Sequence, residues 1–444
     1  MAEETAVTLE LDDIQSGVLS PRPSPYAATF VLLRIDDQGA GRELMLRAST
    51  AVASAAHRTS PSGEAWVSVA LTFQGLRALG VPKTSLDSFA PEFQQGMAAR
   101  AGSLGDVGES SPENWEKPLG TPDVHVVVTA LAPDAQRLER ALERGREAYE
   151  QLRGIQEIWH QECHVLPTEK EPFGFKDGIS HPAVEGSGIP GSNPGEPPFK
   201  AGEFVLGYRD ETGGLPPMPK PDVLGRNGSY AAFRKLHQRV VLFRQFLRTN
   251  SSTPQQEELL AAKMMGRWRS GAPLALSPER DDPLLGPDAA RNNNFAYADD
   301  PVGLKTPAGS HIRRANPRDA SVAGAVRLHR MIRRGTAYGP PLPEGVLEDD
   351  GADRGIMFVF IGSHLKRQFE FVQTEWVNDG VFIGASADKD PISAAHDGSG
   401  SFTIPRRPVR RRLQGLPRFV VTRGGEYCFI PGLRALRWLA NPGT

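Results

Sequence analysis

The chain has 444 residues, of which 39% are hydrophobic and 23% are charged. This is a globular composition, and it excludes a disordered chain, a collagen and a long coiled coil, although 46 Gly and 38 Pro make turns frequent. The formal net charge of −2 excludes a global positive field that would attract nucleic acid or an anionic membrane.

The first half is predicted to alternate strands and helices in the order strand–helix–strand, twice over. This order favours an α+β unit with an antiparallel sheet and helices on one face. No GxGxxG lies between a strand and a helix, and GxxxxGK[ST] is absent, so nucleotide-binding signatures are missing. The predicted strands are 26–35, 65–73, 124–131 and about 155–165, and the predicted helices are 41–57, 74–79 and 134–153.

A segment rich in glycine and proline, residues 182–202, predicts a domain boundary. We therefore expect one domain over residues 1–200 and a second over 201–444. In the second half we predict strands at 203–208, 355–361 and 419–422, a mixed segment at 230–247, helices at 255–265 and 368–376, and a long loop at 269–310.

Hydropathy and cysteine content both indicate the cellular compartment. The longest apolar runs fall far short of the ~18 residues that span a bilayer, and the acidic N-terminal residues 1–13 lack the apolar segment of a secretory signal. Cys163 and Cys428 are too few for a disulfide framework or a cysteine-rich metal site. These features predict a cytoplasmic protein with no membrane partner.

The most unusual short stretch is FGFKDGISH, residues 173–181. Gly174 and Gly178 flank Asp177 and allow a sharp turn that brings its carboxylate close to a ligand. A solvated turn is the plainer interpretation. Apolar neighbours would disfavour the ionised carboxylate and suit it to proton transfer.

Among the ten histidines, His311 has the most suggestive context, in GSHIRRANPR. The nearby Arg314 and Arg318 could bind carboxylates of a large anionic cofactor, or the segment could be a solvated basic loop. His160 and His164 are four residues apart beside Cys163, but they fall in a predicted strand, so a zinc site there is weakly supported.

Two arginine-rich segments allow two interpretations each. Arg333 and Arg334 precede Gly335, which suits either the basic end of a helix or an arginine that faces a pocket. Residues 406–412 (RRPVRRR) suggest nucleic-acid binding, but the net charge and the lack of a stacking-aromatic array argue against it.

FGFKDG resembles the GFxDG motif of dye-decolorizing peroxidases, which are haem proteins. Six further segments resemble that family in the same order, from about residue 12 to 439: DDIQSGVL, GSYAAFRKLHQ, MMGRWRSGAPL, HIRRANPR, HRMIRRGTAYGPPLP and FVQTEWVND. The resemblance implies two ferredoxin-like α+β domains with antiparallel sheets and peripheral helices, with haem bound mainly in the second. His181 departs from the glutamine of many relatives.

The resemblance also implies residue roles. Asp177 would be the distal acid/base, His311 the proximal ligand of the haem iron, and Arg333 the distal arginine, with Arg334 as the competing register. Asp390 would accept the other ring N–H of His311. The remaining expected contacts to the cofactor are the pocket walls Phe358 and Phe360 and the propionate partners Arg314 and Arg318.

The implied activity is that of a haem b peroxidase that reduces hydrogen peroxide and oxidises dyes, phenols or similar small organic reductants. A homodimer is compatible with an exposed α+β sheet. Two alternatives remain at this point: a protein that binds haem or handles its iron without turnover, and a binding module without a cofactor. Four aromatic residues would relay electrons or simply pack in the core: Trp268, Trp376, Tyr338 and Tyr427.

Overall fold

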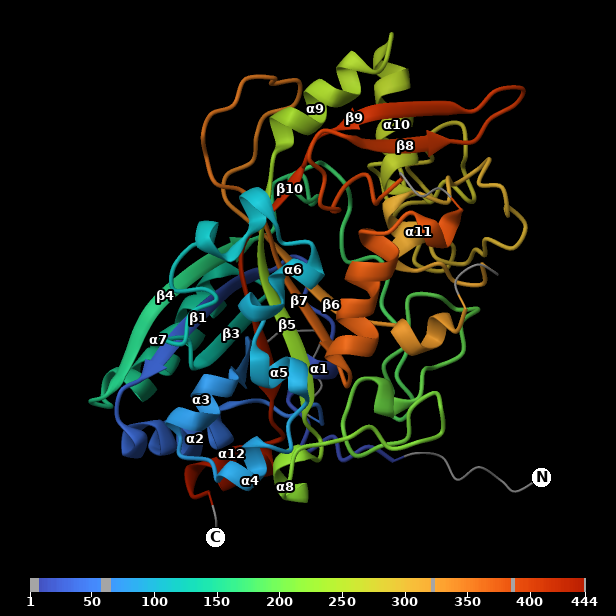
Figure 1. Cartoon of the computed structure of the whole chain (residues 1–444). Helices are drawn as coiled ribbons and strands as arrows, with labels where there is room; N and C mark the ends of the chain where they lie inside the picture. Colours follow the sequence, from blue (N-terminus) through green and yellow to red (C-terminus); the bar gives the residue numbers. More distant parts are fainter. Residues whose placement is uncertain (1–7, 57–64, 321–323, 385–387, 443–444) are drawn as a thin grey trace, which may run out of the picture.

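A single antiparallel sheet of eight strands organises the chain (Figure 1). The structure is a computed structural model that describes residues 8–56, 65–320, 324–384 and 388–442. The strand order is β4-β1-β3-β2-β10-β5-β7-β6. The strands are β1 (Ala27–Ile35), β2 (Trp66–Leu71), β3 (Val126–Ala132), β4 (Ile155–His164), β5 (Ser229–Gln238), β6 (Ile332–Tyr338), β7 (Gly355–Gly362) and β10 (Val420–Ile430).

Each half of the chain contributes four neighbouring strands in the same order. Counted within its own half, each set runs fourth, first, third, second, which is the ferredoxin-like order. The two sets join where Leu71 of β2 pairs with Phe429 of β10. The expected α+β fold of two ferredoxin-like units is thereby confirmed, while the division at residue 200 into separate domains stays a prediction.

The sheet curls, so that its two outer strands approach each other. The thiol of Cys163 in β4 lies next to the hydroxyl of Thr336 in β6. Across the interior, the rings of Phe30 in β1 and Phe233 in β5 lie 5.3 Å apart. Successive residues of a strand point to opposite faces. One face of each strand therefore fills this interior and the other is free to pack against helices.

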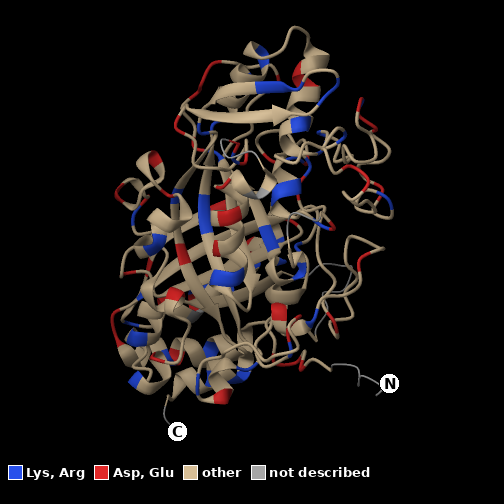
Figure 2. Cartoon of the chain, turned by 45° about the vertical axis from the view of Figure 1, so that its right-hand side comes forward, with Lys and Arg blue, Asp and Glu red and all other residues tan. Residues whose placement is uncertain are grey.

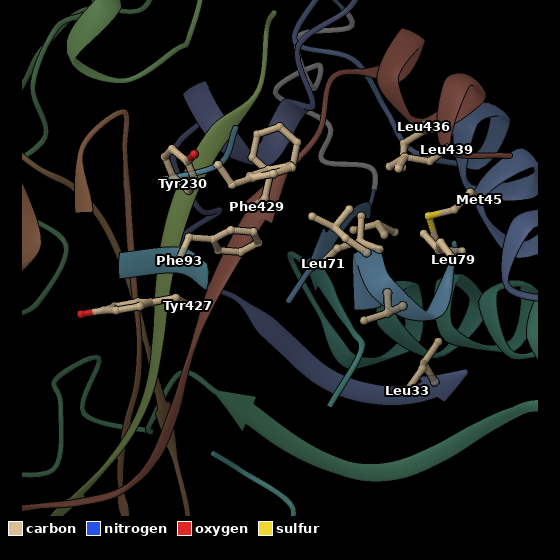
Figure 3. Packing of buried hydrophobic residues seen from close by; sticks show 14 of the residues in the cluster. Leu33, Met45, Leu71, Leu79, Phe93, Tyr230, Tyr427, Phe429, Leu436 and Leu439 are labelled. Atoms are coloured by element: carbon tan, nitrogen blue, oxygen red, sulfur yellow. The ribbon is translucent and has the colours of Figure 1, made fainter. Parts of the chain in front are cut away.

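The main hydrophobic core lies between the sheet and the helices and is shared by both halves (Figure 3). Leu33 and Leu71 of the first half and Tyr230 and Phe429 of the second belong to one buried cluster. Burial of each such side chain contributes about 1.5–3 kcal/mol. The helices that define this region are α2 (Gln38–Ala51), α3 (Phe73–Ala78), α4 (Lys83–Leu86), α5 (Pro91–Gln95), α7 (Ala135–Glu150), α8 (Asp222–Gly225) and α12 (Leu433–Ala440).

The second half adds a group of elements beyond one end of the sheet (Figure 1). They are the helices α9 (Val240–Thr249), α10 (Pro254–Met265) and α11 (His311–Ala315) and the hairpin β8 (Gly400–Ile404)–β9 (Arg411–Leu416). The first half also has two further short helices, α1 (Ser16–Leu19) and α6 (Ala101–Leu104). The second-half helices and the β8–β9 hairpin form a layer that leaves room for a site between itself and the sheet.

Several predicted elements differ from the structure. Residues 203–208 are not a strand, because Glu203 ends a 3-10 turn and Gly207 has a φ of 92°. Residues 368–376 form parts of two π-helical turns, Leu365–Glu370 and Val372–Val377. The strand predicted at 419–422 continues to Ile430, because a bulge near Gly424 absorbs the two glycines.

The segment around Arg333 is a strand rather than the end of a helix. Arg333 and Gly335 belong to β6, which pairs with β7 along its whole length. Gly335 is therefore no helix cap. The basic run 406–412 spans the turn of the β8–β9 hairpin and the start of β9.

Charges of both signs are interspersed over the face in Figure 2, in agreement with the small net charge. None of the helices within the described ranges combines the length and apolar character needed to cross a membrane.

We expect Glu426→Gln to raise the melting temperature at pH 9 by about 2–5 °C and to leave it unchanged at pH 4. Burial raises the pKa of Glu426 in β10 to about 8, whereas the unfolded carboxyl has a pKa of about 4.3. Between these values the folded protein binds the extra proton, so stability falls as pH rises. Thermal unfolding at pH 4 and pH 9 measures the two melting temperatures. The control is Glu150→Gln, at an exposed position of α7. An equal rise in the melting temperature of Glu426→Gln at both pH values would contradict the prediction.

Candidate active site

A cavity of about 330 Å³ separates the sheet of the second half from its helical layer. On the sheet side, most lining residues alternate along their strand, because every second side chain points to the same face. Arg334 of β6 also reaches the lining. The alternating residues are Arg234, Leu236 and Gln238 of β5, Arg333 and Gly335 of β6, Ile356 and Phe358 of β7, and Val420 and Thr422 of β10.

The opposite wall is helical and largely apolar. It comes from α10, α11, the second π-helical turn and the loop that follows Asp390. Its lining residues include Met265, His311, Ile312, Ala315, Val372, Val377, Ile392 and Ala394. The cavity also contains several cationic side chains, among them Arg234, Arg267 and Arg418. A cavity that combines an apolar wall with placed polar groups is typical of a cofactor site.

His311 begins α11, and a buried carboxylate fixes its orientation. Its Nδ1 lies 2.8 Å from Oδ2 of Asp390, whose Oδ1 accepts the backbone N–H groups of Ile392 and Ser393. In the neutral imidazole, Nδ1–H donates to Asp390 and Nε2 carries the lone pair. Among the described residues, Nε2 has no hydrogen-bond partner. A carboxylate–imidazole pair of this kind is typical of a metal-ligating histidine.

Each member of this pair stabilises the charged form of the other. Burial alone would raise the pKa of Asp390, but the charge and hydrogen bond of His311, with the amide of Ser393, bring it to about 2. Burial alone would lower the pKa of His311, and the charge of Asp390 outweighs burial and raises it. Asp390 therefore stays ionised at neutral pH and increases the electron density on the imidazole.

Asp177 lies on the rim of the same cavity, in the loop between the two halves. Gly174 and Gly178 have φ values of 93° and 76°, which a residue with a side chain rarely adopts. The surroundings of Asp177 differ from the expected apolar setting: its side chain is 44% exposed, and Oδ2 lies 3.5 Å from the guanidinium of Arg22. The carboxylate is thus held among cations.

The loop before Asp177 is shaped by Glu171, which the sequence analysis did not select. Its carboxylate accepts the backbone N–H groups of Phe173 and Phe175 and the side-chain amide of Gln238. Burial raises the pKa of Glu171. The only local signal for this role was an acidic residue placed two and four positions before the backbone donors Phe173 and Phe175.

Of the two competing arginines, Arg333 has its guanidinium free for the cavity. No hydrogen bond joins it to the part of the chain that the structure describes, and burial lowers its pKa while the charge of nearby Asp177 opposes that effect. Arg334 also belongs to the cavity lining, but its guanidinium donates to His181 Nδ1 and to the carbonyl groups of Val18 and Leu19. Strand alternation thus gives the two neighbours different partners.

His181 lines the cavity as a neutral imidazole. Burial, followed by the charges of Arg334, Arg330 and Arg333, lowers its pKa to about 3. Its Nδ1 is an acceptor for Arg334 at 3.3 Å. The histidine therefore links the Asp177 loop to β6.

Phe358 lines the cavity as expected, but Phe360 does not. Both point to the same face of β7, yet Phe369 from the first π-helical turn covers Phe360, with ring centres 5.8 Å apart. Phe360 is fully buried in the main core. Its expected role in the pocket wall is therefore corrected to core packing.

Arg314 and Arg318 are absent from the cavity lining as well. The guanidinium of Arg314 is buried and donates to the backbone carbonyl groups of residues 309, 376, 379 and 388. Arg318 stacks on Phe295 at 3.7 Å and donates to the carbonyl groups of Asn293 and Phe295. Both arginines hold neighbouring loops in place, so their expected contact with propionates is corrected.

The four aromatic residues considered for electron relay are buried: Trp268, Trp376, Tyr338 and Tyr427. Core packing accounts for each of them. Within the described ranges, no group of three or more His, Cys, Asp or Glu side chains could hold a metal ion.

Known peroxidases are similar to this chain in sequence and in structure. The family model of the DyP dimeric alpha+beta barrel domain matches residues 14–165. The dye-decolorizing peroxidase of Exidia glandulosa is 31% identical and covers 98% of this chain and 88% of its own length. A solved dye-decolorizing peroxidase in complex with 2,6-dimethoxyphenol is 28% identical, with a TM-score of 0.86 over 97% of this chain and all of that one. The deferrochelatase of Yersinia pestis bv. Antiqua is 28% identical over only 45% of this chain.

Proposed function

The chain belongs to the dye-decolorizing peroxidase family and is a haem-dependent peroxidase, and from this premise we propose which of its residues carry the activity. One observation supports the assignment most strongly. His311, Asp177 and Arg333 are far apart in the sequence, yet all three line a single cavity.

The cavity suits haem by its donor set. His311 would hold the iron through Nε2, and Asp390 would keep the imidazole oriented and electron-rich. The apolar helical wall and Phe358 would contact the porphyrin. Haem, when bound, supplies an iron that hydrogen peroxide oxidises and that organic reductants restore by one-electron steps.

We propose haem b, bound without a covalent link. Neither Cys163 nor Cys428 lines the cavity, so a thioether bond to the cofactor has no thiol donor. The homodimer and the cytoplasmic location stay predictions, which gel filtration with light scattering and cell fractionation would test.

Asp177 is proposed to move the proton of hydrogen peroxide. Its carboxylate would accept a proton from one oxygen and return it to the other, so that the O–O bond breaks with water as the leaving group. Oδ1 of Asp177 makes no hydrogen bond to any residue that the structure describes, so this oxygen is available for the transfer.

Arg333 is proposed to stabilise the negative charge that develops as the O–O bond breaks. We expect Arg333→Leu to slow the reaction with peroxide by about 100-fold, since loss of one donor to a developing anion costs 10²–10³. Stopped-flow spectroscopy measures this rate, and the Soret band should persist. A native rate in the variant would contradict the assignment.

The experiment that tests the proposed function as a whole is a visible spectrum of the purified protein, before and after peroxide, followed by steady-state oxidation of a dye. We expect a Soret band, a change on peroxide addition and turnover that depends on both substrates. The alternative of a haem-binding protein without turnover is not favoured, because the relatives that match nearly the whole chain are peroxidases. Bound haem without dye oxidation would contradict the proposal.

A further inference from the structure

Arg22 forms an ion pair with Asp177, the proposed acid/base. It follows α1 and lines the cavity rim, with a side chain that is only 16% exposed. Its Nη2 lies 3.5 Å from Oδ2 of Asp177. Its neighbours in the sequence, SPRPSP, give no local signal for a role in a site.

A chain of contacts fixes Arg22 to the strand that carries Arg333. The guanidinium lies over the ring of Tyr26, 4.2 Å from its centre. The hydroxyl of Tyr26 accepts the backbone N–H of Ala337 in β6 at 2.8 Å. Arg22 is therefore positioned relative to β6 through Tyr26, although it comes from the first half of the chain.

Two glycines, Gly335 and Gly178, leave room for Oδ2 of Asp177 and for the guanidinium of Arg22. A Cβ placed on Gly335 of β6 would lie 2.9 Å from Oδ2, and one on Gly178 would lie 2.9 Å from Nη2 of Arg22. The two glycines thus admit the carboxylate and the guanidinium. Because the terminal torsion of aspartate is broad, a carboxylate that is 44% exposed would otherwise rotate.

We propose that Arg22 is a positioning residue for the peroxide reaction, which holds Oδ2 of Asp177 against β6 and leaves Oδ1 for proton transfer. This inference rests on the proposed role of Asp177. The stack on Tyr26 keeps Arg22 in place when the carboxylate is neutral, so the acid returns to the same orientation in each cycle.

The test compares Arg22→Gln, Arg22→Lys, Asp177→Asn and the double variant. We expect Arg22→Gln to lower the rate constant for the peroxide reaction about fivefold, the effect of ~1 kcal/mol expected for a half-exposed ion pair. Arg22→Lys should restore most of the rate, and neither substitution should change the Soret band. Arg34→Gln, which removes a half-exposed arginine paired with Asp36 at 2.7 Å, is the matched control and should keep the native rate.

The double variant separates positioning from a structural role. In the Asp177→Asn background, Arg22→Gln should cause no further loss, whereas an independent structural effect would multiply the two losses. In the haem-free protein, the Nε–H signal of Arg22 in ¹⁵N spectra should shift on Asp177→Asn and not on Arg34→Gln. Multiplied losses, or an unshifted signal, would overturn the proposal for Arg22. A native rate for Asp177→Asn alone would instead contradict the proposed function.

Discussion

His311→Ala is expected to lose the Soret band, with haem affinity reduced by more than about 100-fold. Loss of a partner that only orients a metal ligand already costs 10–100-fold in affinity, and His311 is the proposed ligand itself. Titration of haem into the haem-free protein, followed at the Soret maximum, measures the effect. Added imidazole should restore part of the band, because a free ligand can occupy the space that the side chain leaves.

The control for this experiment must separate ligation from folding. Removal of His311 leaves the buried Asp390 without its imidazole partner, and an unpaired buried carboxylate destabilises a protein. His311→Asn places an amide N–H near the position of Nδ1, so it retains a donor for Asp390 and should fold normally while it still binds haem poorly. His164→Ala, at an exposed position of β4, should bind haem like the native protein. Native haem affinity in His311→Asn and His311→Ala would exclude His311 as the ligand.

Asp177→Asn is expected to keep the Soret band and to slow the reaction with peroxide by about 100- to 10,000-fold. A positioned acid/base contributes 10²–10⁴ to a rate, and an amide cannot accept the proton. The amide has the same shape as the carboxylate, so the loop between Gly174 and Gly178 should remain intact. Stopped-flow mixing with peroxide at several concentrations gives the second-order rate constant.

A matched control for the proton transfer is Asp123→Asn, at an exposed loop position outside the cavity lining. It should react with peroxide at the native rate. If Asp177→Asn reacts equally fast, another group moves the proton. If it fails to bind haem, Asp177 contributes to the architecture of the site instead.

Local patterns in the sequence were sufficient for much of the fold. The apolar runs around Val31, Val69 and Val128 became β1, β2 and β3, because a half-buried strand needs β-branched and aliphatic side chains in an extended run. Errors arose where the backbone has unusual geometry. The two π-helical turns and the bulge at Gly424 depend on contacts that no short stretch specifies.

Some site residues could be found from local sequence, whereas others depend on contacts made only in the folded chain. FGFKDG and HIRRANPR indicated Asp177 and His311, because glycine spacing and a histidine among arginines are visible within a few residues. Which of Arg333 and Arg334 keeps its guanidinium free for the cavity could not be predicted, since both reach the lining. Only the folded chain brings His181, Val18 and Leu19 to the guanidinium of Arg334.

By itself, the sequence determined the α+β class, the family resemblance, the glycine-flanked acid and the candidate proximal histidine, because each depends on composition or on residues close together in the chain. The tertiary structure alone decided that Arg314 and Arg318 hold backbone carbonyl groups, that Phe360 packs in the core and that Arg22 pairs with Asp177. The physical reason is that the partners of these side chains come from distant segments, and only folding brings donors and acceptors within hydrogen-bond distance of each other.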